Sequence, residues 1–204
     1  MTDNDMSNVS LIYLCYNDEP YKYLDRVLSR IKNQTYSRAN LELIIVYNPG
    51  KEKKEETVKF VKEKIDLEKD NLPKVIFLPQ EENIGFVGGN NKGIEYVLAS
   101  LHSDYVFLHN ADGFLAEDAI EKMAEMMEKD HSVGVLQPLV LLYPETDLIN
   151  TSGNNFHYLG FGYCGEYRRN TSPQLSHYKI NGNVREIGFV SGAAMMTRVD
   201  LLKK

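Results

Sequence analysis

The stretch NIGFVGGNNKG (residues 83–93) is the most informative segment of this sequence. It lies between a short apolar run at residues 74–78 and a helical pattern at residues 94–101, so we expect it to join a strand to a helix. Glycines let a backbone come close to a ligand, and amide groups at a helix start can face a phosphate. The glycine spacing matches neither the Walker loop nor the GxGxxG dinucleotide fingerprint.

Composition alone leaves two interpretations of this stretch open. One is a tight strand-to-helix turn with no ligand. The other is a ligand-binding segment, which Asn90 and Asn91 favour. Side-chain amides recognise hydroxyls or base edges, and asparagine is a poor choice for the first turns of a helix.

Outward from this stretch, apolar runs alternate with helical patterns from residue 9 to about residue 130. The predicted strands are residues 9–16, 41–47, 74–78 and 105–109, and apolar residues recur at helical spacing in residues 21–31, 58–65, 94–101 and 120–127. The strand-like runs are nearly continuous in apolar character, which is typical of strands covered on both faces. The alternation predicts right-handed βαβ crossovers and a mainly parallel sheet.

The composition changes after the fourth helical pattern. A fifth strand is predicted at residues 133–142, and residues 143–183 are rich in Gly, Asn, Tyr and Ser, which indicates hairpins and long loops. A further strand is expected at residues 184–190 and the start of a helix at residues 199–204. The length of 204 residues suggests one domain, or one domain with a large extension.

Composition and charge exclude several classes of protein. Hydrophobic residues make up 43% and charged residues 25%, as in soluble globular proteins. Cys15 and Cys164 form no CxxC pair, which excludes a cysteine zinc site or a disulfide scaffold and fits a reducing compartment. The net charge of −6 argues against nucleic acid as a partner. With an acidic start and no apolar run of roughly 18 residues, the expected location is the cytoplasm.

Polar residues end three of the predicted strands. Tyr16 and Asn17 follow the first, Asn48 follows the second, and Asn110 and Asp112 follow the fourth. Open α/β sheets place their ligands at the carboxyl ends of the strands, where a carboxylate such as Asp112 can hold a divalent cation that bridges diphosphate oxygens. Turn chemistry or helix capping is the alternative explanation for each of these residues.

These motifs, in this order, resemble those of the family 2 glycosyltransferases, and in particular of the bacterial rhamnosyltransferase-like branch. The matching segments are residues 9–17, 43–48, 83–93, 105–112, 134–138, 149–153 and 190–195. The similarity extends over essentially the whole chain, and the glycine–asparagine stretch is its specific part.

The resemblance implies a GT-A-like α/β fold, a three-layer α/β/α sandwich with a mainly parallel central sheet. It implies transfer of a sugar, with inversion, from a UDP- or dTDP-sugar to a glycan or lipid-linked glycan, with Mg²⁺ or Mn²⁺ as cofactor. Residues 1–142 would be the nucleotide-sugar-binding half, and residues 143–204 the start of the acceptor-side region. The implied donor-binding residues are Tyr16, Asn17, Asn48, Gly85, Phe86, Gly88, Asn90, Asn91, Asn110, Asp112, Ser191 and Gly192, of which Asp112 would hold the cation.

The chain departs from the family pattern in two ways. Tyr47 stands where the family usually has an aspartate that contacts the nucleotide, which leaves the base preference open. The family's general base lies beyond the segment matching residues 190–195, so we expect it beyond Lys204, in a longer protein that could also carry a membrane attachment.

Two alternative functions remain open at this stage. A non-catalytic nucleotide-sugar-binding or scaffolding module could keep the fold and lose the chemistry. A nucleotidyltransferase would need a basic, glycine-rich loop after the first strand, whereas the residues there, CYNDE (residues 15–19), are acidic.

Overall fold

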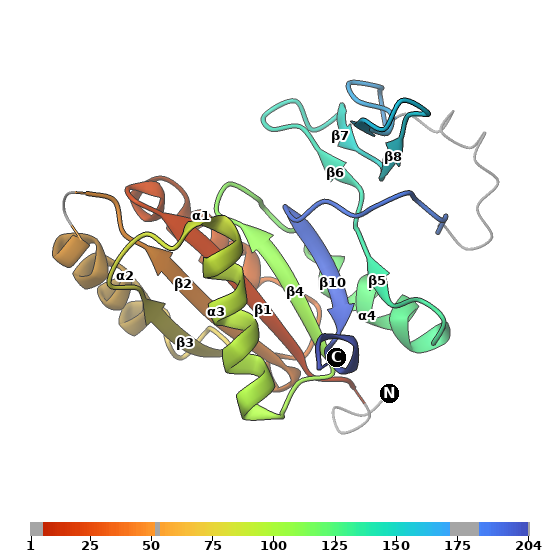
Figure 1. Ribbon diagram of the computed structural model, residues 1–204. Helices are drawn as coiled ribbons and strands as arrows, with labels where there is room; N and C mark the ends of the chain where they lie inside the picture. The colour runs from red at the N-terminus through yellow and green to blue at the C-terminus, as the bar shows by residue number, and fades with distance from the viewer. Residues whose placement is uncertain (1–5, 52–53, 172–183, 204) are drawn as a thin grey trace. The chain divides into compact units, whose positions relative to one another are not determined.

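The computed structural model describes residues 6–51, 54–171 and 184–203 (Figure 1). The chain forms two compact units, residues 1–136 with 192–204, and residues 137–191. The first unit contains a six-stranded sheet with its helices, and the second contains two small two-stranded sheets.

The elements of the first unit alternate as the sequence predicts. Its strands are β1 (Val9–Tyr16), β2 (Leu41–Asn48), β3 (Lys74–Pro79), β4 (Tyr105–Asn110), β5 (Val135–Leu136) and β10 (Ala194–Arg198). Its helices are α1 (Glu19–Lys32), the 3₁₀ helix η2 (Arg38–Asn40), α2 (Lys54–Glu68), α3 (Gly85–Ser100), α4 (Ala119–Lys129) and α5 (Val199–Leu202). No described helix has both the length and the apolar character needed to span a bilayer.

The sheet order is β3-β2-β1-β4-β10-β5, and the prediction of a mainly parallel sheet is confirmed. β3, β2, β1 and β4 run parallel, whereas β10 is antiparallel to β4 and to β5. Val9 pairs with both Leu41 and Tyr105, so the three central strands start level. Their carboxyl ends therefore reach the same edge of the sheet.

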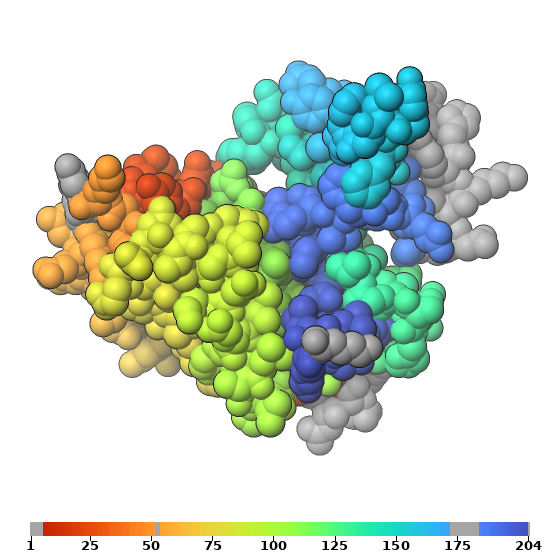
Figure 2. All heavy atoms as spheres, in the orientation of Figure 1, coloured from red at the N-terminus to blue at the C-terminus, as the bar shows by residue number. Residues whose placement is uncertain are grey.

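Alternate residues of β1 face two separate cores. Leu11, Tyr13 and Cys15 pack in the core that contains α1 and α4, whereas Ile12 and Leu14 pack in the core that contains α3. Helices thus cover both faces of the central strand, which makes the three-layer sandwich. Figure 2 shows one of these faces, where the yellow-green atoms of α3 cover the sheet.

Helix α3 begins at Gly85, nine residues earlier than the periodic pattern at residues 94–101 indicated. The glycine-rich stretch is helical because α3 lies very close to β1. A Cβ atom at Gly93 would lie 2.6 Å from Cγ2 of Ile12, and one at Gly89 would lie 2.5 Å from Cδ1 of Leu14. Glycine is required there by packing, and local helix propensity is overridden.

Two strand predictions in the last third of the chain were wrong, and one strand there was not predicted. The expected strand at residues 133–142 is two separate strands, β5 in the first unit and β6 (Val140–Leu141) in the second. Residues 184–190 form no strand, although Phe189 makes a single bridge with Asn154. β10 was not predicted, because a five-residue strand with the sequence AMMTR has no clear alternation.

The second unit is built of short hairpin strands, as its composition predicted. Its strands are β6 (Val140–Leu141), β7 (Ile149–Thr151), β8 (Asn154–Phe156) and β9 (Gly162–Cys164). β6 pairs with β7 and β8 with β9, both antiparallel.

Candidate functional site

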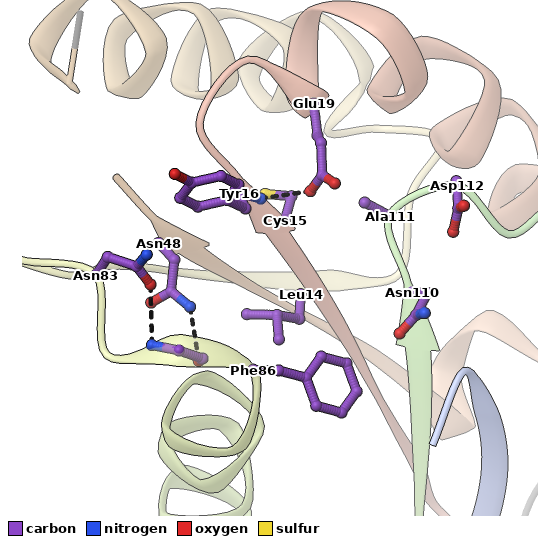
Figure 3. A pocket seen from close by; sticks show the side chains of 11 residues that line it. Leu14, Cys15, Tyr16, Glu19, Asn48, Asn83, Phe86, Asn110, Ala111 and Asp112 are labelled. Carbon is purple, nitrogen blue, oxygen red and sulfur yellow. Dashed lines mark hydrogen bonds between the residues drawn. The ribbon is translucent and has the colours of Figure 1, made fainter. Parts of the chain in front are cut away.

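A cavity of about 330 Å³ opens at the carboxyl edge of the parallel strands of the first unit (Figure 3). Figure 3 shows its side chains entering from β1, the start of α1, the end of β2, the start of α3 and the turn after β4. It is lined by Leu14, Cys15, Tyr16, Glu19, Asn48, Asn83, Gly85, Phe86, Asn110, Ala111 and Asp112. Four parts of the chain that are far apart in sequence therefore meet where open α/β sheets place their ligands.

Half of the predicted donor-binding residues line this cavity. Those that do are Tyr16, Asn48, Gly85, Phe86, Asn110 and Asp112. Those that do not are Asn17, Gly88, Asn90, Asn91, Ser191 and Gly192. A ligand role for the second group stays a prediction.

The structure places Asn17 and Asn90 in local structural roles. Asn17 has a left-handed backbone (φ 50°), and its N–H donates to the carbonyl oxygen of Asn48 (3.0 Å). Asn90 is buried in α3 and donates from Nδ2 to the carbonyl oxygen of Phe86 (3.0 Å). Gly88 and Asn91 lie in the same helix. Asn17 thus occupies a turn position, which is one of the alternatives that sequence analysis left open, whereas the Asn90 side chain bonds a carbonyl of its own helix.

Ser191 and Gly192 belong to different units. The N–H of Ser191 donates to Oε1 of Gln137 (2.6 Å) within the second unit. Gly192 belongs to the first unit, where a Cβ atom on it would lie 3.4 Å from Cε1 of Phe86. The Gly192 backbone therefore runs beside a ring that lines the cavity.

The start of α3 is held by two asparagines. Gly85 has a left-handed backbone (φ 75°), which an L-residue with a side chain would adopt only with strain. Its N–H donates to Oδ1 of Asn83 (2.9 Å), and its carbonyl oxygen accepts from Nδ2 of Asn48 (2.9 Å). Asn83 was not among the predicted site residues, although it opens the glycine-rich stretch.

Glu19 is a second residue of the cavity that sequence analysis missed. It is the first residue of α1, and its Oε2 accepts the N–H of Tyr16 (2.6 Å), as Figure 3 shows. Partial burial raises the pKa of the Glu19 carboxyl, the Tyr16 hydrogen bond lowers it, and the negative charge of Asp112 raises it again. The only sequence signal was the acidic character of residues 15–19.

Removing the Glu19 acceptor should destabilise the turn between β1 and α1. We expect Glu19→Ala to lower the free energy of unfolding by about 1–2 kcal/mol, because the Tyr16 N–H loses its partner. Glu19→Gln should stay within about 0.5 kcal/mol of the wild type at pH 4, since an amide oxygen also accepts. Urea unfolding measures both changes.

The raised pKa of Glu19 gives this comparison a pH signature. The folded wild type holds a proton that the unfolded chain releases, so it should lose stability relative to Glu19→Gln as the pH rises through the pKa of Glu19. Parallel pH profiles, with Glu19→Gln as unstable as Glu19→Ala throughout, would contradict this account.

Tyr47, the departure from the family pattern, does not line the cavity. It is fully buried in the core with α1, and it pairs with Cys15 across the sheet. Burial raises the pKa of its hydroxyl. Its neighbour Asn48 is the β2 residue that lines the cavity.

The charges of the cavity suit a divalent cation. Its lining contains the carboxylates Glu19 and Asp112 and the amide of Asn110, and no lysine, arginine or histidine is among the described residues that line it. Carboxylate and amide oxygens are the ligands that Mg²⁺ and Mn²⁺ take. The described residues hold no cluster of three or more His, Cys, Asp or Glu side chains arranged for a metal. A cation bound here would therefore need further oxygens from a small molecule bound in the same cavity.

Two solved structures have a fold similar to that of this chain. The mannosyltransferase PcManGT from Pyrobaculum calidifontis, in complex with GDP-Man and Mn²⁺, superposes with a TM-score of 0.62 at 16% identity over 98% of this chain and 47% of its own. TarS 1–349 from S. aureus, in complex with UDP-GlcNAc, gives a TM-score of 0.59 at 15% identity over 96% of this chain and 46% of its own. The GT-A-like fold is confirmed.

Sequence comparisons agree with the fold. A Haemophilus influenzae protein described as an uncharacterized glycosyltransferase is 30% identical over 129 residues, which are 63% of this chain and 46% of the relative. This chain thus spans about half the length of the relative it matches. The sequence model of glycosyl transferase family 2 matches residues 10–204. This chain therefore belongs to glycosyl transferase family 2.

Proposed function

We propose that the chain binds a nucleotide-diphospho-sugar together with Mg²⁺ or Mn²⁺ in the cavity and transfers the sugar, with inversion, to a glycan or lipid-linked glycan. The observation that carries the proposal is the lining of the cavity. Two carboxylates, several amides and two aromatic rings meet at the carboxyl edge of the sheet in a family 2 chain. The volume of about 330 Å³ falls in the range of small-molecule sites.

Electrostatics supports the cation. A diphosphate would meet the negative charges of Glu19 and Asp112 with no positive side chain from the cavity lining to offset them. A divalent cation, when bound, neutralises the diphosphate and stabilises the nucleoside diphosphate as it leaves. Asp112, helped by Asn110, is the proposed protein ligand of this cation.

The remaining residues of the cavity suit the rest of the donor. The Tyr16 side chain is 45% exposed and offers a ring face to a base. Asn48, Gly85 and Phe86 form the proposed wall around the ribose and diphosphate. UDP- and dTDP-sugars are the proposed donors, and a rhamnosyl or other hexosyl group is the proposed transferred group. The resemblance places the general base after the segment matching residues 190–195, and none is assigned in the cavity.

Thermal unfolding with nucleotides tests the proposal. We expect UDP or dTDP with Mn²⁺ to raise the Tm by about 5–10 °C at 100 times the Kd, which corresponds to about 2.7 kcal/mol, and we expect EDTA to remove most of this shift. GDP and ADP serve as comparisons for base preference. The absence of any shift at millimolar concentration would contradict the donor-site assignment.

The second candidate function is a binding module without transfer activity. The observation that favours it is Tyr47, which is buried in the core where the family has a nucleotide-contacting aspartate. Sugar release from the donor separates the two functions. The assay uses the longest natural chain. If that chain binds the donor in an Mn²⁺-dependent way, but neither releases free sugar nor transfers it to an acceptor, the binding module is favoured.

A further inference from the structure

The turn that carries Asp112 is held from several sides. It follows β4, and the N–H of Gly113 donates to the carbonyl oxygen of Asn110 (3.2 Å). The N–H of Asn110 in turn donates to the carbonyl oxygen of Ala193, the residue before β10 (3.0 Å). Among the described residues, no hydrogen bond or ion pair holds the exposed Asp112 carboxylate itself. The backbone of the turn therefore sets where this carboxylate lies.

Tyr13 reaches this turn from the neighbouring strand. Its hydroxyl donates to the carbonyl oxygen of Ala111 (3.3 Å), and its side chain is fully buried. Burial raises the pKa of this hydroxyl, and the nearby negative charges of Glu19 and Asp112 raise it further. The hydroxyl therefore keeps its proton and remains a donor. Nothing in the sequence pattern distinguished Tyr13 from the other apolar residues of β1.

His109 packs against the same turn. Its imidazole is 3% exposed and lies 5.8 Å from the Tyr13 ring, centroid to centroid. Burial lowers its pKa to about 4, so the ring is neutral at pH 7. A Cβ atom on Gly113 would lie 3.3 Å from Nε2 of His109, so the turn rests directly on this ring.

We propose that Tyr13 is a positioning residue, which fixes the Asp112 turn through the Ala111 carbonyl and thereby sets the cation affinity of the cavity. This inference rests on the proposed function, in which Asp112 holds the cation. Tyr13 does not touch the cation or the donor. It restricts the backbone next to the one carboxylate that must be correctly placed, as groups that orient metal ligands do.

The test compares two tyrosine-to-phenylalanine variants. Tyr13→Phe keeps the buried ring and removes the donor to Ala111. Tyr36→Phe is the matched control, because the Tyr36 side chain is also buried and its hydroxyl also donates to a backbone carbonyl, that of Ser7. We expect similar falls in Tm for both variants. Mn²⁺ affinity in the presence of UDP or dTDP should fall about 10-fold in Tyr13→Phe and less than about 2-fold in Tyr36→Phe.

A second variant disturbs the same turn without changing Tyr13. Gly113→Ala places a methyl group 3.3 Å from Nε2 of the buried His109 ring and 3.4 Å from the carbonyl oxygen of Asn110, so the ring and the turn must separate by a few tenths of an ångström. We expect Mn²⁺ affinity to fall at least about 3-fold, with nucleotide affinity in EDTA unchanged. Electron paramagnetic resonance of bound Mn²⁺ and calorimetry measure the two affinities.

The outcomes separate this inference from the proposed function. Wild-type Mn²⁺ affinity in Tyr13→Phe, with a Tm loss like that of Tyr36→Phe, would overturn the positioning role and leave the proposed function intact. A wild-type chain that binds nucleotide equally well with and without Mn²⁺ would overturn both. Weaker Mn²⁺ binding in Tyr13→Phe and in Gly113→Ala, with little change in Tyr36→Phe, would support both the positioning role and the proposed function.

Discussion

Asp112→Ala should abolish the Mn²⁺-dependent part of nucleotide binding. We expect the affinity for UDP or dTDP with Mn²⁺ to fall at least about 100-fold, which is about 2.7 kcal/mol. The physical reason is that Asp112 is the carboxylate at the end of β4 that lines the cavity, and no lysine, arginine or histidine among the described lining residues could hold the diphosphate in place of a cation. Calorimetry with and without EDTA measures the effect.

Two further variants make this result specific. Asp112→Asn keeps the size of the side chain and removes its charge, so it should lose most of the Mn²⁺ dependence as well. Asp66→Ala removes an exposed carboxylate of α2 outside this cavity and should leave binding unchanged. Equal Mn²⁺-dependent affinities in Asp112→Ala and the wild type would remove Asp112 from the proposed cation site.

Gly93→Val should produce the largest loss of stability among the substitutions considered. The first atom of any side chain at position 93 would lie 2.6–3.0 Å from three carbons of Ile12, which is fully buried in β1. Helix α3 and strand β1 cannot separate without opening the core between them. We expect a loss of about 2–3 kcal/mol and a Tm lower by about 4–12 °C. Thermal and urea unfolding measure these changes.

The matched control lies on the same helix. Ala99 is exposed near the end of α3, so Ala99→Val introduces the same β-branched residue without a clash and should cost about 0.5 kcal/mol. If the two valine variants were equally stable, the close approach of α3 to β1 would be wrong, and with it the reason why the glycine-rich stretch is helical.

The central strands and their common edge were predictable because their signals are local. β1, β2 and β4 are short apolar runs whose ends were predicted to within one residue. Parallel strands covered on both faces must be apolar along their whole length, and right-handed crossovers bring their carboxyl ends together. The sequence alone therefore assigns Tyr16, Asn48, Asn110 and Asp112 to one edge of the sheet.

The sequence by itself thus determined the class of fold, the family and the edge of the sheet at which the cavity lies. Only the tertiary structure decided that α3 starts at Gly85, that Glu19 and Asn83 line the cavity, that Asn90 is buried, and that β10 completes the sheet. Each of these depends on contacts between residues far apart in the chain. The contact of Gly93 with Ile12 and the hydrogen bond of Tyr13 with the Ala111 carbonyl cannot be predicted from local sequence patterns. In each case the two partners come together only when the whole sheet forms.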